Sequence, residues 1–445
     1  MRMETLARRA LSEAMKQGAG EAEIYISVSG EKSIEVRNGQ VETLKEAESS
    51  GMGVRVFRDG RMGFAYTSVL SDTGVEQACR KALGNTMITG PDEYNGLSAP
   101  QDVPYVEVPF DREIADTSVE GKIRMALAVE EAARETDNRI TAIESCGYED
   151  VTVEAVILNS LGVEAQSEAA YCGIYAALLA EEEGQSETGF AMSFKRRIGS
   201  LQPQECGREA AGKALRMLGA GSTRTRRMPL VFDPHATVRL LDVLAPSFSG
   251  ENVLKGKSML DQSLGQQVMA PCLTVVDDGT LDDGVMSAPA DGEGMARRRN
   301  VLVDAGTVSA FLHNGYTARR SGTVTTGSAS RGGYAGIPGV GTSNLFIQPG
   351  TRTEEELIGQ VDDGLYLTDL LGVHTANPVT GDFSLGAAGL LIEGGRLSRP
   401  VRGIVISGNL LELFGHVRDV ADNLTFFAGT GAPSMLCGPL TVSGE

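Results

Sequence analysis

The chain has 445 residues, a formal net charge of −19 at pH 7, 55 glycines and no tryptophan. This length exceeds a single hydrophobic core of usual size and predicts two or three domains. Because a large negative charge repels phosphate backbones, direct binding of nucleic acid is not expected. No apolar stretch approaches the roughly 20 residues that span a bilayer. We therefore expect a cytoplasmic protein that does not contact membranes.

The N-terminal segment predicts one helix followed by a meander of strands. Residues 1–17 place apolar side chains on one helical face, and Glu4 interrupts what would be the apolar part of a signal peptide. A strand with period-two alternation follows at 22–30. Asn38-Gly39 and Asp59-Gly60 are then strong signals for tight hairpin turns. A second helix is predicted over 72–83, with Ser71 or Asp72 as its cap.

The same order recurs in the next hundred residues. A predicted helix at 118–137 precedes further strands and a closing helix at 203–218. Each series contains a hairpin that ends in Gly-Phe-Ala, at 63–65 and at 189–191. The pattern predicts an N-terminal α+β domain at 1–105 and a central α+β domain at 106–220. These could be two similar halves, each an α-β-meander-α unit.

The amino-acid composition changes near residue 220, where Gly, Ser, Thr and Arg cluster. Beyond it, short β-like runs alternate with turn residues, including Ala305-Gly306 and Gly394-Gly395. Two helices interrupt them, one at 235–245 and one after residue 408. Regular short strands predict a C-terminal, mainly-β sandwich or barrel-like domain over 221–445. The expected fold class is therefore α+β.

Familiar catalytic motifs are missing from the sequence. There is no GxSxG, no HExxH and no phosphate-binding loop. The only histidines are His235, His313, His374 and His416, no two of them within a helical turn of each other. Six cysteines form no CxxC pair, so neither a disulfide framework nor a zinc knuckle is indicated. A cysteine nucleophile with a distant histidine remains one alternative, which would make the chain a stand-alone peptidase.

The segment 374–395 is the most unusual part of the C-terminal half. Its turn formers are followed by the small residues of "SLGAAG". It could be a loop that feeds a strand. Alternatively, small residues beside an open strand edge suit an extended peptide, bound through main-chain hydrogen bonds. The candidate peptide-binding residues are Asn377, Pro378, Thr380, Gly381, Asp382, Ser384 and Gly386.

Several ordered segments together carry a family resemblance. They include "VRNGQVETLKEAESSGMGVRVFRDGRMGFAYTS", "DGEGMARRRNVLVDAGTVSAFLHNGYTARRSG", "NPVTGDFSLGAAG" and "VRGIVISGNLLELF". Over nearly its whole length the chain resembles the TldD/PmbA family, historically labelled modulator of DNA gyrase. The TldD branch of that family looks like a zinc protease with an HExxxH motif. The PmbA (TldE) branch lacks the motif and pairs with TldD, and this sequence resembles that branch.

The resemblance implies that zinc chemistry has been lost here. Asp242 and Ser247 stand where the two histidines would be, and Val243 replaces the glutamate. A valine side chain cannot activate water, and one aspartate cannot build a three-ligand zinc site. Cys437 is out of register with the cysteine ligand of the TldD branch and is interpreted as structural. No catalytic residue, metal or cofactor is therefore expected in this chain.

The family likeness further implies the partners. Zinc is expected only in a TldD-like partner that carries HExxxH, and unfolded or flexible peptides are the expected substrates. A homodimer or a heterodimer is expected, since β domains have strand edges that need covering. The remaining alternative is a regulatory binder without enzymatic activity, as the gyrase-modulator label suggests.

Overall fold

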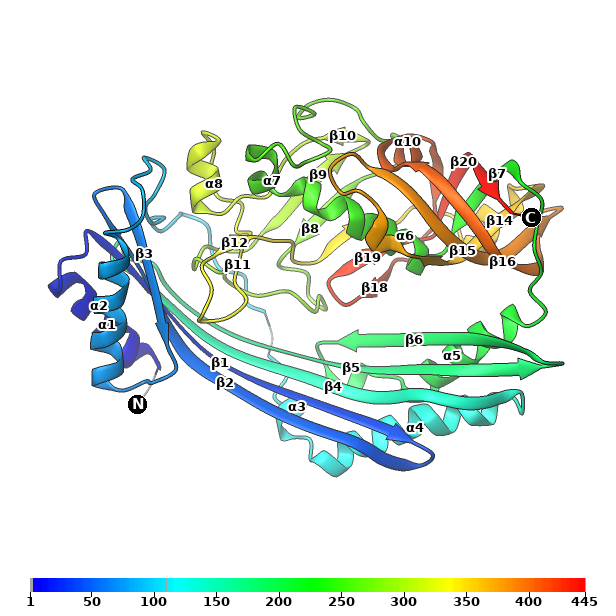
Figure 1. Ribbon diagram of the computed structural model, residues 1–445, viewed down its shortest axis with the longest axis horizontal. Coiled ribbons are helices and arrows are strands. Elements are labelled where there is room, and N and C mark those ends of the chain that lie inside the picture. The colour runs from blue at the N-terminus through cyan, green and yellow to red at the C-terminus, as the bar shows by residue number, and fades with distance from the viewer. Residues whose placement is uncertain (1–2, 109, 445) are drawn as a thin grey trace.

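A computed structural model describes residues 3–108 and 110–444. The N-terminal half is one long, curved sheet with helices on its outer face, and the C-terminal half lies over the opposite face (Figure 1). Within the described residues, no helix combines the length and the apolar character needed to cross a bilayer.

The helices and strands of the N-terminal half follow the predicted order. Their bounds are α1 Met3–Lys16, β1 Glu21–Arg37, β2 Gln40–Arg58, β3 Arg61–Thr67, α2 Asp72–Asn85, α3 Glu113–Asp116, α4 Val119–Thr136, β4 Ile140–Asn159, β5 Glu164–Glu182, β6 Gln185–Lys195, the 3-10 helix η1 Ile198–Ser200 and α5 Pro203–Met217. The hairpin turns are confirmed, since Asn38 and Asp59 both adopt positive φ, at 53° and 52°.

The expected repeat is present, and its two halves share one sheet. Strand order is β3-β2-β1-β4-β5-β6, and β1 pairs antiparallel with β4 at the centre. Ile24 and Ile26 pack into a core with α1 and α2, whereas Ile34 packs into a core with α4 and α5. Because side chains two apart share a face of a strand, both helix pairs cover the same face of the sheet. The opposite face is left for the C-terminal half.

Glycine brings each closing helix unusually close to its edge strand. A Cβ on Gly63 in β3 would lie 1.9 Å from the carbonyl oxygen of Ala82 in α2. In the second half, a Cβ on Gly189 in β6 would lie 2.0 Å from the carbonyl oxygen of Ala210 in α5. The two Gly-Phe-Ala segments therefore mark the same packing contact in the two halves.

The C-terminal half contains the remaining elements. Their bounds are β7 Arg226–Phe232, α6 Pro234–Leu244, η2 Ala245–Phe248, α7 Gly250–Leu254, β8 Val275–Asp278, β9 Arg299–Asp304, β10 Thr307–Val308, α8 Gly315–Arg320, β11 Ala329–Ser330, β12 Gly339–Val340, β13 Leu345–Ile347, α9 Glu354–Gly359, β14 Asp363–Leu371, η3 Val373–Thr375, β15 Asp382–Glu393, β16 Arg396–Asn409, α10 Leu410–Gly415, β17 Val417–Val420, β18 Thr425–Phe427, β19 Thr430–Ala432 and β20 Met435–Ser443.

The predicted barrel-like domain is confirmed. Strands β16-β15-β14-β7-β20 are neighbours, and antiparallel pairing of β16 with β20 closes them into a barrel. A second sheet, β10-β9-β8-β13-β19-β18, packs with α6 and the barrel around one large core that includes Phe232, Leu241 and Phe414. The mainly-β C-terminal half and the helix-covered sheet together confirm the α+β class.

Four buried charges join the C-terminal half to the sheet. Arg55 on β2 donates to Glu23 on β1 at 2.7 Å and to Glu293 at 2.9 Å, while Arg331 pairs with the other oxygen of Glu23. Each of these side chains is no more than 6% exposed. Burial opposes ionisation of Glu23, but Arg331 and Arg55 outweigh it and lower its pKa. This cluster fixes the position of the C-terminal half relative to the sheet, together with the contact of Tyr334 with Gly51.

Replacing Glu23 by glutamine should strongly destabilise the protein. Both arginines would lose a charged partner while remaining buried, which costs about 3–5 kcal/mol in comparable pairs. Calorimetry of Glu23→Gln should show a large fall in Tm. The matched control is Glu76→Gln, which breaks an exposed pair with Arg80 and should change stability by about 0.5 kcal/mol or less. Equal effects of the two changes would contradict the structural role of the cluster.

Replacing Gly63 by alanine should loosen the contact of α2 with β3. The added methyl group overlaps a backbone carbonyl, so strand and helix must separate, at a cost of about 1–3 kcal/mol. The control is Gly84→Ala in α2, where a Cβ meets nothing within 4 Å and alanine favours the helix by about 1 kcal/mol. Chemical denaturation should therefore give changes of opposite sign, and a stabilising Gly63→Ala would be evidence against the close contact.

Candidate functional site

The three residues that the resemblance placed opposite the HExxxH motif, Asp242, Val243 and Ser247, lie on and just after α6. Asp242 is exposed, and Val243 packs against the C-terminal core. Ser247 is fully buried, and its hydroxyl has no hydrogen-bond partner among the described residues. No group of three or more His, Cys, Asp or Glu side chains in the described chain is placed to hold a metal ion. The residues at this helix therefore do not fit a catalytic zinc ion.

The cysteines do not form a reactive centre. Burial raises the pKa of five thiols to about 12, those of Cys79, Cys146, Cys172, Cys206 and Cys437. Cys437 lies in β20 within the barrel core. Cys272 is exposed, but desolvation also raises its pKa, and the described residues that line its groove include no histidine. The raised thiol pKa values, and a described Cys272 groove lined by Asp304 but by no histidine, therefore give no support to a cysteine nucleophile paired with histidine.

The predicted peptide-binding residues divide between an exposed turn and a barrel strand. In the turn, Asn377 accepts hydrogen bonds from the amides of Val379 and Thr380, and Asn409 donates to the carbonyl oxygen of Thr380 at 2.8 Å. Asn409 also caps α10. The turn therefore joins the start of β15 to α10, with Pro378 and Asp382 exposed on its surface.

The open strand edge predicted in this segment is limited to the first residues of β15. Ser384 pairs with Ser407 of β16, and Gly386 pairs with Leu371 of β14 and Val405 of β16. From Gly386 onward β15 is an interior strand of the barrel, flanked by β14 and β16, whereas Asp382–Leu385 pair with β16 alone. The small side chains of β15 therefore allow its neighbouring strands to pack closely, and they do not mark a place where a peptide strand is added. Ala387 and Ala388, which follow the predicted residues, line a cavity.

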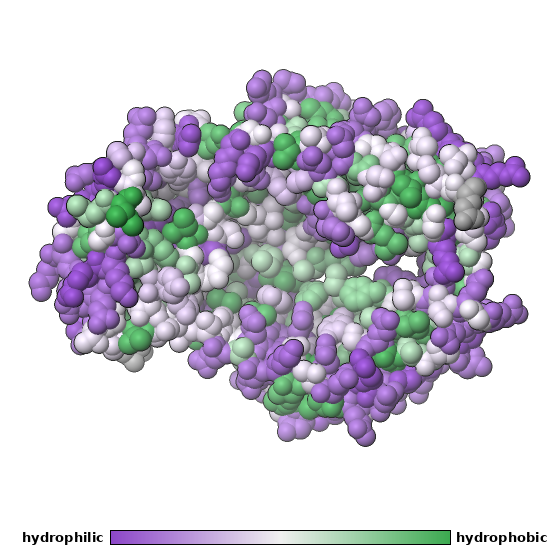
Figure 2. Space-filling model, viewed as in Figure 1, coloured by the Kyte–Doolittle hydropathy of each residue, from purple (hydrophilic) through white to green (hydrophobic). Residues whose placement is uncertain are grey.

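That cavity lies between the sheet and the barrel and has a volume of about 330 Å³. Figure 2 shows a hollow between the two halves of the molecule, with pale and apolar surface inside it. The lining residues come from seven elements: Glu187–Met192 of β6, Lys213, Arg216 and Met217 of α5, His235 of α6, Thr368, Asp369 and Leu371 of β14, Ala387 and Ala388 of β15, Arg402 and Gly403 of β16, and Phe427 of β18.

An open strand edge does line this cavity, and it belongs to β6. Within the described chain β6 pairs only with β5, and it ends the six-stranded sheet. All six residues from Glu187 to Met192 line the cavity. Alternate N–H and C=O groups of an edge strand point away from its sheet, so the cavity presents main-chain donors and acceptors to a ligand.

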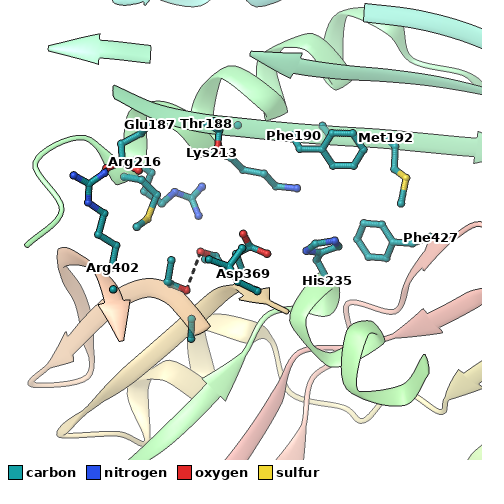
Figure 3. A pocket seen from close by; sticks show the side chains of 18 residues that line it. Glu187, Thr188, Phe190, Met192, Lys213, Arg216, His235, Asp369, Arg402 and Phe427 are labelled. Carbon is teal, nitrogen blue, oxygen red and sulfur yellow. Dashed lines mark hydrogen bonds and ion pairs between the residues drawn. The ribbon is translucent and has the colours of Figure 1, made fainter. Parts of the chain in front are cut away.

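Charged side chains gather at the Glu187 end of the cavity. Arg402 of the barrel forms an ion pair with Glu187 of β6, which bridges the two halves of the molecule. Burial raises the pKa of Glu187, and Arg402 opposes this rise. Lys213 extends from α5 into the space above Asp369 (Figure 3) and pairs with Glu209 at 2.7 Å.

Aromatic side chains occupy the opposite end. Phe190 and Met192 of β6 face Phe427 and His235 across the cavity (Figure 3). The rings of His235 and Phe427 meet edge-on, with centroids 5.2 Å apart. Burial lowers the pKa of His235, and the positive charge of Lys213 lowers it further. The imidazole is therefore neutral near pH 7.

Sequence reasoning missed most of these residues. Residues 187–192, Lys213 and Arg216 lie in segments for which the sequence predicts only strands and helices, and His235 is only one of four dispersed histidines. One signal was available, because Gly189 ends a hairpin that repeats an earlier one. Such a repeat marks a sheet edge. That Lys213 and His235 meet at this edge follows only from the packing of the barrel on the sheet.

Family models match the chain in three consecutive parts. These are the PmbA/TldA metallopeptidase domain 1 at residues 22–86, the central domain at 112–218 and the C-terminal domain at 225–444. All three models describe domains of one class of metallopeptidase-related proteins, and they match this chain in consecutive order. The chain belongs to the PmbA/TldD family.

Individual relatives are similar to this chain over nearly their full length. Metalloprotease PmbA of Escherichia coli O157:H7 is 27% identical over 445 residues, covering 98% of this chain and 96% of the relative. A crystal structure from Thermotoga maritima MSB8, assigned as a modulator of a DNA gyrase, has a TM-score of 0.92 and 29% identity, covering 99% and 100% of the two chains. TldE from Thermococcus kodakarensis shares the fold, with a TM-score of 0.90, 24% identity and the same coverage.

Asp233, which caps α6 beside the cavity, should make stability depend on pH. Burial raises its pKa to about 7, so the folded state holds a proton that the unfolded chain releases near pH 4. This contribution to stability is complete below about pH 4 and is lost as the pH rises through 7. Asp233→Asn keeps an acceptor for the amide of Ala236 and cannot ionise.

The Tm of Asp233→Asn relative to the native chain should therefore increase between pH 4 and pH 8. The free energy of unfolding of the variant relative to the native chain should rise by at least about 1 kcal/mol over the same range, since one pKa unit corresponds to about 1.4 kcal/mol. Differential scanning fluorimetry across this range measures it. A difference in Tm that is constant with pH would show that the carboxyl group is not perturbed.

Proposed function

We propose that this chain is the zinc-less, PmbA/TldE-like subunit of a cytoplasmic two-subunit metallopeptidase. It holds unfolded or flexible peptides, and a TldD-like partner with HExxxH hydrolyses them. The observation that carries this proposal is the replacement of the motif by Asp242, Val243 and Ser247 in a chain that otherwise keeps the family fold. A buried serine and a valine packed in the core supply neither a ligand set nor a base.

The edge of β6 supports peptide as the ligand. An extended peptide beside β6 would pair with main-chain groups of residues 187–192, and this recognition tolerates many sequences. Leu371 at the cavity is 56% exposed and precedes the exposed turn at 377–382 by only a few residues. That turn, with Asn377, Pro378, Thr380, Gly381 and Asp382, is retained as a second contact with the peptide.

A stand-alone peptidase has less support. Five of the six thiols are buried with raised pKa values, and Cys272 lies in a groove whose described lining contains no histidine.

Metal analysis of the isolated chain and of the complex tests the proposal. The isolated chain should contain no zinc above background and should not cleave peptides. Co-expression with a TldD-type chain from the same genome should give a complex with about one zinc per heterodimer and with peptidase activity. Replacing the motif glutamate of the partner by glutamine is the control, and it should abolish hydrolysis while the complex persists. Stoichiometric zinc and hydrolysis by the isolated chain would refute the assignment.

A further inference from the structure

We infer, building on the proposed function, that the β6 cavity selects peptides by two features on opposite faces of an extended chain. One feature is a carboxylate and the other is a large apolar side chain. The inference rests on the different chemistry of the two walls that flank the open edge of β6.

The side chains of β6 alternate between these walls. Gly189 and Ala191 face α5, since Gly189 lies against Ala210 and Ala191 belongs to the core beneath α4 and α5. Phe190 and Met192 must then face the opposite side, where Figure 3 shows them pointing toward Phe427. The edge of β6 therefore runs between an α5 wall and an aromatic wall.

The α5 wall is cationic. Lys213 and Arg216 both line the cavity and are three residues apart, on one face of α5. Arg402 is already paired with Glu187, so the carboxylate of Asp369 alone opposes these two cations within the lining. The pair of Lys213 with Glu209 is an i,i+4 contact on a helix surface, which contributes little and exchanges readily. A ligand carboxylate that reaches this wall gains two donors.

The aromatic wall is apolar and uncovered. Phe190 is 43% exposed on an edge strand, and Phe427 stands opposite it. His235 beside them is kept neutral by burial, so it does not add a charge to this wall. A large apolar side chain inserted between the two phenyl rings would remove their faces from water.

A peptide strand paired with β6 presents successive side chains to alternate walls, because the side-chain period of a strand is two residues. An acidic residue and an apolar residue satisfy both walls only if they are separated by an odd number of positions. The carboxylate can come from an Asp or Glu side chain or from the C-terminus of the peptide. Both sources offer the same chemistry to Lys213 and Arg216.

Fluorescence anisotropy with short labelled peptides tests the inference on the full-length chain. The peptides are acetylated and amidated and are rich in Ser and Thr. Each carries one Leu and one Glu at positions i and i+1, i and i+2, or i and i+3, which are spacings of one, two and three. Spacings of one and three should bind at least about fivefold more tightly than a spacing of two, which corresponds to about 1 kcal/mol. Replacing Glu by Lys should weaken binding about tenfold or more. A peptide without Glu but with a free C-terminal carboxylate identifies whether the terminus can substitute.

Variants of the chain assign the effect to the walls. Lys213→Gln with Arg216→Gln should abolish the preference for Glu over Lys, and Phe190→Ser should abolish the preference for Leu over Ser. Arg208→Gln, an exposed change on the same helix outside the cavity, should leave both preferences intact. Circular dichroism of each variant confirms that it folds.

The outcomes separate the inference from the proposed function. Binding that ignores Glu, Leu and their spacing would overturn the selection rule and leave a general peptide-holding subunit. Failure of every peptide to bind, both to the chain and to its complex with the TldD-type partner, would instead count against peptide holding itself.

Discussion

The buried cluster of Glu23, Arg55, Glu293 and Arg331 is the interaction on which the rest of the structure depends. Two carboxylates and two guanidinium groups pair with one another in a buried site. Charges in such a site are costly unless each is paired, so the arrangement permits few relative positions of the sheet and the barrel.

Much of the fold could be predicted because its signals are local. Turns such as Asn38-Gly39 require positive φ, and period-two and helical patterns identify the main strands and helices. The repeated Gly-Phe-Ala segments predicted two similar units. The sequence did not predict that β1 and β4 join these units into one sheet, because pairing between distant strands leaves no local pattern.

The candidate site was harder to predict for the same reason. Small residues in β15 were interpreted as a sign of an open edge, but they permit close strand packing inside a barrel. The open edge lies in β6, whose sequence resembles any half-buried strand. His235, Lys213 and Asp369 are unremarkable separately and acquire a shared role only when three elements meet. In contrast, the zinc-less role that we propose rests on the identities of Asp242, Val243 and Ser247 alone, and it stays a prediction.

The length of the sheet amplifies at its far end any rotation about the charged cluster. Glu23 lies opposite Asn159 at one end of β4, whereas the β5 residues that pair with the cavity edge lie opposite Ile140–Gly147 toward the other end. A strand of this length extends about 65 Å at about 3.3 Å per residue. A rotation of about 5° at the charged cluster therefore moves the far end by about 6 Å. Such a tilt would admit a polypeptide without melting any strand, with Glu187 and Arg402 as the contact that must part first.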